Sequence, residues 1–486
     1  MKFTDISAIT LSLALALGPA LSLRSQELSV TASSVGQTDD GDDDEAENVD
    51  VPDATETFED SDDNDASVRE NAVIDFGEIN GDDIDIPVPS FIRQNQNHVI
   101  FNGADWSELR KAFAQAATRP VSIVHIGDSH VQADINTGVT RDLLQYDFGN
   151  AGRGIITPLK MSGTNQPADY TFSSPDSWSA VRLMSRTWDR PMGFTGTSIH
   201  PAAQSGSITV GTSENDDYDP FSTVTLFHGG KITIDNVVNG SGEKVHFRSI
   251  PSRDYTQIVL ASQETKVTIS FTSKGDLTIY GASLGGGRPG VFYHAIGNNG
   301  ATYATYNRIG NVGPGIAALQ PELVIISLGT NEAFGRLDTA TFFSTIDRLV
   351  QNIRTSNPRA QILLVTPMEC QRSAYKTVSK KVKTKGRRTK KGKRRKAGYR
   401  TVNTKVKSYR RNANILPLRN EILRYGRENG VAVLDWYEVA GGSGASDVWV
   451  SNGLFSKDRV HHSYKGYHLQ GRLLYDALID ALKNNQ

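Results

Sequence analysis

Short runs of β-branched and other apolar residues alternate with segments of helical periodicity in two separate parts of the chain. Four such runs read as buried strands, at 121–126, 323–328, 362–367 and 431–434. Apolar residues at helical spacing predict helices beside them, at 105–117, 136–146, 339–354, 418–428 and 466–483. Strands that alternate with helices favour a parallel sheet covered on both faces, and such sheets bind ligands at the carboxyl ends of their strands. The pattern therefore predicts an α/β fold and indicates where its functional residues lie.

The segment between residues 159 and 281 has a different texture. Short alternating runs appear there without helical segments between them, at 207–210, 223–227, 231–234, 257–260, 266–271 and 276–280. Repeated short strands separated by Gly, Asp, Asn and Ser clusters are typical of β-sandwiches and jelly rolls. We therefore expect an inserted β-sandwich or jelly-roll module at 159–281, which divides the α/β domain into two parts, 93–158 and 282–486.

The charge of the chain is distributed very unevenly. The formal net charge is only −2, but residues 39–86 hold 21 acidic residues and one Arg, and residues 376–411 hold 18 basic residues and no acid. The acidic region has almost nothing to bury, so we expect a disordered tether at 25–92. The basic insertion at 376–411 has three interpretations: a solvated disordered loop, a contact for an anionic polymer such as wall polysaccharide, nucleic acid or lipid headgroups, or a partner for the acidic tether. Specific nucleic-acid recognition is not expected, because the aromatic interleaving and fold signatures of such proteins are missing.

The N-terminus has the composition of a secretory signal. Lys2 precedes a mostly apolar stretch at 6–23, and small residues at 20–22 suit cleavage, so residues 1–24 are expected to be a signal peptide. A secreted, periplasmic or cell-surface location follows, with an uncleaved anchor as the alternative because Asp5 lies in the basic region. No later apolar run is long enough to span a membrane. The single cysteine, Cys370, excludes an intrachain disulfide and a multi-cysteine zinc site.

Three polar motifs lie where predicted strands end or the last helix begins: Gly-Asp-Ser-His at 127–130, Gly-Thr-Asn-Glu at 329–332 and Asp-Arg-Val-His-His at 458–462. A fourth, Gly-Asn-Asn-Gly-Ala-Thr at 297–302, precedes a helix-like turn after the β-rich segment. A serine hydroxyl becomes a nucleophile when a base takes its proton and a third group orients that base. Ser129, His461 and Asp458 supply these groups for acyl transfer. The negative oxygen formed needs donors, for which the N–H groups of Ser129 and Gly300 and the Asn331 amide are candidates.

Several of these candidates also have structural interpretations. Ser129 and Asp458 are residue types that cap helices, and Asn331 is a common turn residue. Gly297 is an alternative to Gly300 as the main-chain donor. The acyl-transfer interpretation is favoured because Ser129 follows a predicted strand and because an ordered set of four motifs is far more specific than any one of them.

Other polar and aromatic residues near the motifs have less specific assignments. His462 is an alternative to His461 as the base, and otherwise is expected to contact solvent or substrate. We expect packing or loop-bracing roles for His125, His130, Asp134, His294 and Glu332. Within the insertion, the aromatic side chains either stack on sugars or pack in the core: Trp178, Trp188 and Phe194.

The four motifs, in this order, resemble the sequence blocks of the SGNH (GDSL-type) hydrolase superfamily. Similarity to the bacterial peptidoglycan O-acetylesterases comes from Val-Gln-Ala-Asp at 131–134, Phe-Gly-Asn-Ala-Gly-Arg-Gly at 148–154, Tyr-His-Ala-Ile-Gly at 293–297 and Glu-Ala-Phe at 332–334. The resemblance covers about residues 95–375 and 430–483, and the acidic tether and the basic insertion depart from it. Those enzymes also carry a β-rich module between the first two blocks.

The resemblance implies a three-layer, flavodoxin-like hydrolase domain. In that family the first-block Ser is the nucleophile, a Gly and an Asn complete the oxyanion hole, and an Asp-x-x-His supplies the rest of the triad. These roles fall on Ser129, Gly300, Asn331, Asp458 and His461.

We therefore expect an exported serine esterase that removes O-acetyl groups from a cell-wall polysaccharide, most simply peptidoglycan, without a metal or organic cofactor. The alternatives are an acetyl esterase for xylan-like or capsular glycans, a polysaccharide O-acetyltransferase, and a noncatalytic surface-binding protein.

Overall fold

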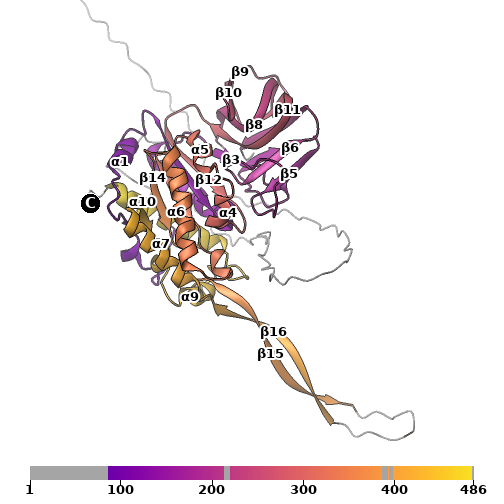
Figure 1. Cartoon of the computed structure of the whole chain (residues 1–486), viewed down its shortest axis with the longest axis vertical. Coiled ribbons are helices and arrows are strands. Elements are labelled where there is room, and N and C mark those ends of the chain that lie inside the picture. Colours follow the sequence, from indigo (N-terminus) through magenta and orange to yellow (C-terminus); the bar gives the residue numbers. More distant parts are fainter. Residues whose placement is uncertain (1–85, 213–218, 386–391, 393–397, 484–486) are drawn as a thin grey trace, which may run out of the picture.

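A computed structural model of the chain describes residues 86–212, 219–385, 392 and 398–483 (Figure 1). The expected signal peptide at 1–24 and most of the expected acidic tether at 25–92 lie outside these residues. The described end of that tether contacts the folded domain, because Ile92 is buried in the hydrophobic core and Val88 and Phe91 pack against it. None of the helices in the described residues has the length and apolar character needed to cross a bilayer.

The central sheet has six strands in the order β1-β17-β14-β13-β2-β12. Their bounds are β1 Val99–Ile100, β17 Ala432–Leu434, β14 Gln361–Val365, β13 Leu323–Ser327, β2 Pro120–Gly127 and β12 Gly290–Gly297. Strand β1 is antiparallel to β17, and the other five strands are parallel to their neighbours. In chain order these five run 2-1-3-4-5, which is the flavodoxin-like order. The predicted α/β class and parallel sheet are thus confirmed, although β1 and β12 were not predicted as strands.

Helices cover both faces of this sheet and make three layers (Figure 1). Successive residues of β2 point to opposite faces, so Ile123 belongs to one hydrophobic core and Val124 to the other. The first core is closed by α1 Ser107–Ala114, α3 Ile135–Phe148, α8 Trp436–Val439, α9 Ala445–Ser451 and α10 Tyr464–Lys483. The second core is closed by α4 Tyr303–Asn307, α5 Val312–Ala317, α6 Thr339–Ser356 and α7 Ile415–Asn429. Burial on both sides explains why β2 and β13 are mostly apolar.

The β-rich region forms one nine-stranded sheet with antiparallel pairing. Its strands are β3 Gly154–Ile156, β4 Tyr170–Ser173, β5 Trp178–Arg182, β6 Thr197–Pro201, β7 Ser205–Thr212, β8 Phe221–Asn239, β9 Phe247–Pro251, β10 Tyr255–Glu264 and β11 Lys266–Gly285. The runs expected at 223–227 and 231–234 are both parts of β8, and those at 266–271 and 276–280 are both parts of β11. Register shifts interrupt the β8–β11 pairing where these runs meet, and Gly230 adopts a φ of +95° there. The region has its own hydrophobic core.

The basic insertion contains a long two-stranded hairpin that projects from the body (Figure 1). Strand β15 spans Gln371–Thr384 and pairs over its whole length with β16, Gly398–Arg411. The interpretation of 376–411 as a disordered loop is wrong for these strand residues, whose Thr, Val and Tyr content suits β structure. The many lysines between them obscured that signal. Residues 386–391 and 393–397 lie outside the described part of the chain.

Candidate active site

The turn that carries Ser129 lies at the carboxyl end of β2. Ser129 begins the short helix α2, Ser129–Gln132, and the residue that caps this helix is Asp128, whose Oδ1 accepts the N–H of His130 at 3.0 Å. The capping interpretation of Ser129 is therefore wrong. A Cβ on Gly127 would lie 2.3 Å from Val131 Cγ2, so only glycine lets α2 fold back so closely on the strand.

A continuous hydrogen-bonded chain joins Ser129, His461 and Asp458. Ser129 Oγ lies 2.7 Å from His461 Nε2, and His461 Nδ1 lies 2.6 Å from Asp458 Oδ2. Both Ser129 and His461 are buried, with exposed fractions of 5% and 6%. An arrangement of this kind lets imidazole take the hydroxyl proton while the carboxylate holds the ring in the required tautomer.

The loop before α10 holds Asp458 and His461 in register. Asp458 Oδ1 accepts the N–H groups of Val460 and His461 at 2.8 and 3.0 Å. Burial opposes the charged form of Asp458, but the His461 hydrogen bond and the two N–H groups outweigh it and hold its pKa below the ordinary value. Ser463, not Asp458, bonds the first turn of α10 through Gly466 N. The helix-capping interpretation of Asp458 is therefore wrong.

His462 is excluded as a solvent contact and as the alternative base. Its side chain is 1% exposed, and its Nε2 lies 3.1 Å from Met368 Sδ. Burial lowers the pKa of His462 to about 3, so the ring is neutral. His130 packs between the rings of His461 and His462, with centroid distances of 5.3 and 5.1 Å. His130 therefore braces the His461 imidazole, and His462 supports His130.

Two neighbouring loops surround the Ser129 turn. Gly300 has a φ of +77° and Gly297 ends β12, where a Cβ would lie 2.0 Å from Gln132 N. Among the described residues, no main-chain acceptor is recorded for the N–H of Ser129 or Gly300. The Asn331 amide nitrogen lies 3.0 Å from the Ala301 carbonyl and 3.2 Å from Asp128 Oδ2. Asn331 thus connects the loops that follow β2, β12 and β13.

Gln132 joins the same loops from the other side, a role that the sequence did not reveal. Its Oε1 accepts the N–H of Asn299 at 2.7 Å, and its Nε2 donates to Asn165 Oδ1 at 2.7 Å. Asn299 Nδ2 also donates to Asn165 Oδ1, at 2.7 Å. The amide triangle fixes the loop of Gly300 against α2. The only sequence signal was the position of Gln132 in the motif that follows Ser129.

Two buried carboxyl groups lie beside the site. Burial raises the pKa of Asp128 to about 6 and that of Glu332 to about 7, and the nearby Asp128 charge adds to the rise at Glu332. Glu332 begins a 3-10 turn, Glu332–Phe334, and its Oε1 accepts the Tyr303 N–H at 2.8 Å. The expected loop-bracing role of Glu332 is confirmed by this contact.

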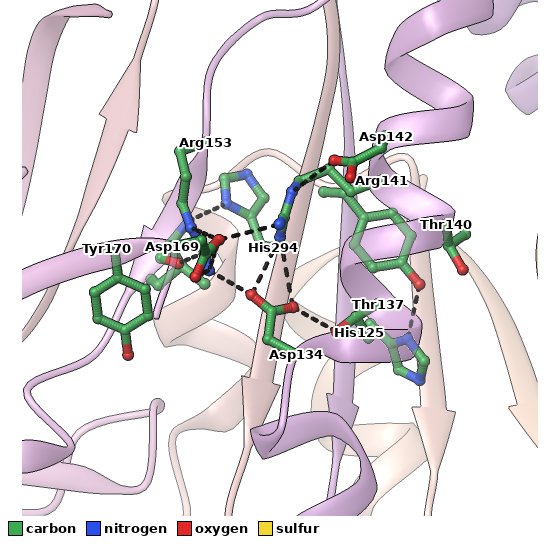
Figure 2. A network of polar contacts seen from close by, with 12 residues as sticks. His125, Asp134, Thr137, Thr140, Arg141, Asp142, Arg153, Asp169, Tyr170 and His294 are labelled. Atoms are coloured by element: carbon green, nitrogen blue, oxygen red, sulfur yellow. Dashed lines mark hydrogen bonds and ion pairs between the residues drawn. The ribbon is translucent and has the colours of Figure 1, made fainter. Parts of the chain in front are cut away.

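A charged network behind α2 was also missed by the sequence analysis (Figure 2). Asp134 and Asp169 pair with Arg141 and Arg153, and three of these four side chains are at most 8% exposed. The two arginines outweigh the effect of burial and hold the pKa of Asp134 below its ordinary value. Because Asp134 has a φ of +52° in the two-residue connection between α2 and α3, the network fixes the position of the helix that carries Ser129.

The two histidines expected to lie in the core, His125 and His294, are buried near this charged network (Figure 2). His125 contacts Tyr293 Oη and Ser327 Oγ, both at 2.7 Å, and His294 Nδ1 accepts the N–H of Ile155 at 3.0 Å. Burial lowers the pKa of both histidines to about 3. Their predicted packing roles are therefore confirmed.

The β-rich region contacts the site through the loop after β5. Met184 is 44% exposed, and its Cε would lie 3.5 Å from a Cβ on Gly300. Arg308 at the end of α4 holds this loop, since it donates to the carbonyls of Leu183 and Ser185 and stacks on Trp188 with 4.3 Å to the ring centroid. Trp188 is thus covered, Phe194 is buried, and Trp178 packs beside Phe271. These contacts favour the packing interpretation of the three aromatic residues.

Part of the chain matches a known protein family, and several solved structures are similar to it. Residues 278–469 match the GDSL-like Lipase/Acylhydrolase family. A peptidoglycan O-acetylesterase structure is similar over 79% of this chain and 99% of its own, with 22% identity and a TM-score of 0.61. A lipase/acylhydrolase from Enterococcus faecalis covers 40% of this chain and 80% of its own, with 18% identity and a TM-score of 0.26. A family 3 carbohydrate esterase from Talaromyces cellulolyticus covers 41% and 74%, with 16% identity and a TM-score of 0.26.

No protein with curated annotation matches the sequence. The family match spans the motifs at 297–302, 329–332 and 458–462, and the first structural match extends the common fold over the β-rich region. Residues 278–469 thus have the sequence features of the GDSL-like lipase/acylhydrolase family, and the fold of the chain is similar to that of a peptidoglycan O-acetylesterase.

Proposed function

We propose that this protein is an exported serine esterase that removes O-acetyl groups from a cell-wall polysaccharide, with peptidoglycan as the first candidate. The observation that carries the proposal is the unbroken hydrogen-bonded chain from Ser129 through His461 to Asp458. Its first distance, 2.7 Å, is within proton-transfer reach.

The reaction proceeds through an acetyl-enzyme. Ser129 Oγ attacks the ester carbonyl carbon while His461 Nε2 takes the hydroxyl proton, and Asp458 stabilises the resulting imidazolium. The tetrahedral intermediate then collapses, the carbon–oxygen bond to the sugar breaks, and His461 returns the proton to the sugar oxygen. Water attacks the acetyl group in the second half, gives a proton to His461, and leaves acetate and free Ser129 after that proton returns to Oγ.

The N–H groups of Ser129 and Gly300 and the Asn331 amide are proposed to stabilise the oxyanion. The two main-chain groups have no recorded main-chain acceptor among the described residues. The Asn331 amide nitrogen donates to the Ala301 carbonyl at 3.0 Å and to Asp128 Oδ2 at 3.2 Å. The proton of the longer contact, to Asp128, is the one proposed to be shared with the oxyanion. Loss of one such donor typically lowers kcat by about 100- to 1000-fold.

Three observations support a polysaccharide acetate as the substrate. Met184 from the β-rich region lies beside Gly300, so that region borders the acyl site. We propose that it packs as a sandwich-like module around its own core and orients the glycan. The structurally similar peptidoglycan O-acetylesterase covers both regions, and the N-terminal sequence has the features of a secretory signal.

We also propose that the basic insertion contacts an anionic polymer.

The test is acetate release from O-acetylated peptidoglycan, compared with acetylated xylan and an aryl acetate. The proposal expects release from peptidoglycan to be fastest and to vanish in Ser129→Ala. Faster release from xylan would assign a different glycan. Transfer of acetyl to an added sugar in preference to water would assign a transferase. Equal activity of Ser129→Ala and the unaltered protein would reject the triad, and inactivity of both on every ester would assign a noncatalytic role.

A further inference from the structure

The hairpin β15–β16 presents two chemically different faces. In an antiparallel pair, directly opposed residues lie on the same face, and alternate residues along a strand lie on opposite faces. The register therefore places Tyr375, Lys381, Lys383, Tyr399, Lys405 and Lys407 on one face, the Tyr–Lys face. The other face, the Lys–Val face, carries Lys376, Val378, Lys380, Val382, Arg400 and Val406.

A repeated pair of side chains characterises the Tyr–Lys face. Tyr375 lies directly opposite Lys407, and Tyr399 lies directly opposite Lys383. Tyr375 and Tyr399 are 70% and 69% exposed. Exposure of an aromatic ring to water is energetically unfavourable, so two such rings on one face suit a binding surface. The two pairs are eight residues apart along β15, or about 27 Å at the usual strand rise. The same pair repeated along one face suits a ligand whose own chemistry repeats.

Most of the charge on the hairpin strands lacks an acidic partner among the described residues. Its two strands carry ten Lys and Arg and no acidic residue. Among the described residues, Arg411 is the only one of these ten that forms an ion pair with an acidic side chain, to Asp447 and Glu369. Two-stranded hairpins are at best marginally stable alone, and like charges weaken them further. A bound polyanion would neutralise the repulsion.

The root of the hairpin lies against the loop of Asp458. Tyr409 Oη donates to the Lys457 carbonyl at 2.9 Å, and the Arg459 guanidinium stacks on the Tyr409 ring, 4.0 Å from its centroid. Tyr409 is on the Tyr–Lys face, and Lys457 and Arg459 flank Asp458. A chain lying along this face therefore reaches the loop that bears the proposed acid and base.

We propose that the Tyr–Lys face binds a linear anionic glycan, with sugar rings stacked on Tyr375 and Tyr399 and carboxylate or phosphate groups paired with the lysines. The bound glycan chain leads toward the Asp458 loop, so the esterase binds its polymer at a second place outside the acyl site. The Lys–Val face has similar charge but lacks exposed aromatic rings. This assignment rests on the proposed function for its biological meaning, but the binding does not depend on ester turnover.

Binding is measured with full-length Ser129→Ala protein, so that no ester is consumed and failure of the proposed catalysis leaves the measurement intact. The probes are polygalacturonate, a carboxylate glycan, a teichoic-acid-type phosphate polymer with sugar rings, polyphosphate without rings, and neutral dextran. One variant carries Lys381→Gln, Lys383→Gln, Lys405→Gln and Lys407→Gln. Its matched control removes four charges from the opposite face, as Lys376→Gln, Lys380→Gln, Arg400→Gln and Arg410→Gln.

We expect the Tyr–Lys variant to raise the Kd for an anionic glycan at least tenfold and to make its salt dependence shallower by about one unit per lost contact. The matched control should change Kd less than threefold. The double variant Tyr375→Ala, Tyr399→Ala should weaken binding of polygalacturonate and of the teichoic-acid-type polymer, but not binding of polyphosphate. Whichever of the two sugar polymers the unaltered face binds more tightly identifies the anion as carboxylate or phosphate. Equal losses in both charge variants, tighter binding of dextran, or no loss in either variant would overturn the proposal.

Discussion

Asp458→Asn separates the two tasks of this carboxylate. Oδ1 accepts two main-chain N–H groups at 2.8 and 3.0 Å, and Oδ2 accepts from His461 Nδ1 at 2.6 Å. Asparagine has one oxygen for these two places. If its NH₂ faced the main-chain donors, two buried N–H groups would lose their acceptor, at about 1–3 kcal/mol each. The oxygen therefore stays with the loop and the NH₂ faces His461.

That orientation inverts the imidazole tautomer. Nδ1 must then accept a hydrogen bond, so Nε2 carries the proton and can no longer take one from Ser129. The equivalent change in serine proteases lowers kcat by about 10⁴-fold, or about 5 kcal/mol of barrier. We expect a loss of this size in kcat for aryl acetate, with KM and the free energy of unfolding nearly unchanged, because the loop keeps its hydrogen bonds.

Steady-state kinetics and urea unfolding of the two proteins test this reasoning. Asp338→Asn is the matched control, since Asp338 caps α6 and Asn caps helices equally well. A loss in kcat below tenfold would refute the tautomer argument. So would a large loss accompanied by a fall of several kcal/mol in stability, because the loop itself would then have changed.

Three further changes test the surroundings of the site. Arg153→Met leaves Asp134 and Asp169 under-compensated and should lower the free energy of unfolding by about 3–5 kcal/mol in urea, whereas a change below 1 kcal/mol would show that the network is dispensable. Burial raises the pKa of Glu332 to about 7 from 4.5, so the folded state holds more protons between these values and stability falls as pH rises through them. Glu332→Gln should remove up to about 3 kcal/mol of that fall, and parallel pH–stability curves would contradict the assignment. Gly127→Ala should cost about 1–3 kcal/mol by overpacking against Val131 and lower kcat by moving Ser129, so unchanged kinetics would be the contrary result.

The parts of the fold that follow from local pattern were predictable from the sequence. Strands β2 and β13 are buried on both faces and mostly apolar, with Ser122, His125 and Ser327 as the polar exceptions, and α6 has a clear helical stripe. Strand β12 was missed because His294 and Tyr293 interrupt its apolar run, and both are accommodated by buried hydrogen bonds that only the tertiary structure supplies. The hairpin was missed because its lysines read as a solvated segment.

The part of the site that was predictable is the contact between two residues close together in sequence, because their spacing within one turn of the chain determines whether their side chains meet. Asp458 and His461 are three residues apart, and the carboxylate reaches the ring as expected. The burial of His462 could not be foreseen, because it depends on Met368, which lies 94 residues earlier in the chain. The same holds for the Gln132–Asn165–Asn299 triangle and the Arg141–Arg153 network, whose partners come from three separate segments.

Strands β3 and β11 pair antiparallel, with Ile156 opposite Ala282 and Gly154 opposite Leu284. The β-rich region therefore leaves and re-enters the catalytic domain at adjacent points, as a short turn would. Strands β2 and β12 are neighbours in the central sheet although the β-rich region separates them in sequence. Once that region has folded, its adjacent ends bring the two strands close together, so that pairing them no longer requires closure of a long flexible loop. Because Leu183, Phe194 and Phe227 of this region also belong to the second hydrophobic core, a replacement module would have to supply these packing contacts as well as two closely spaced ends.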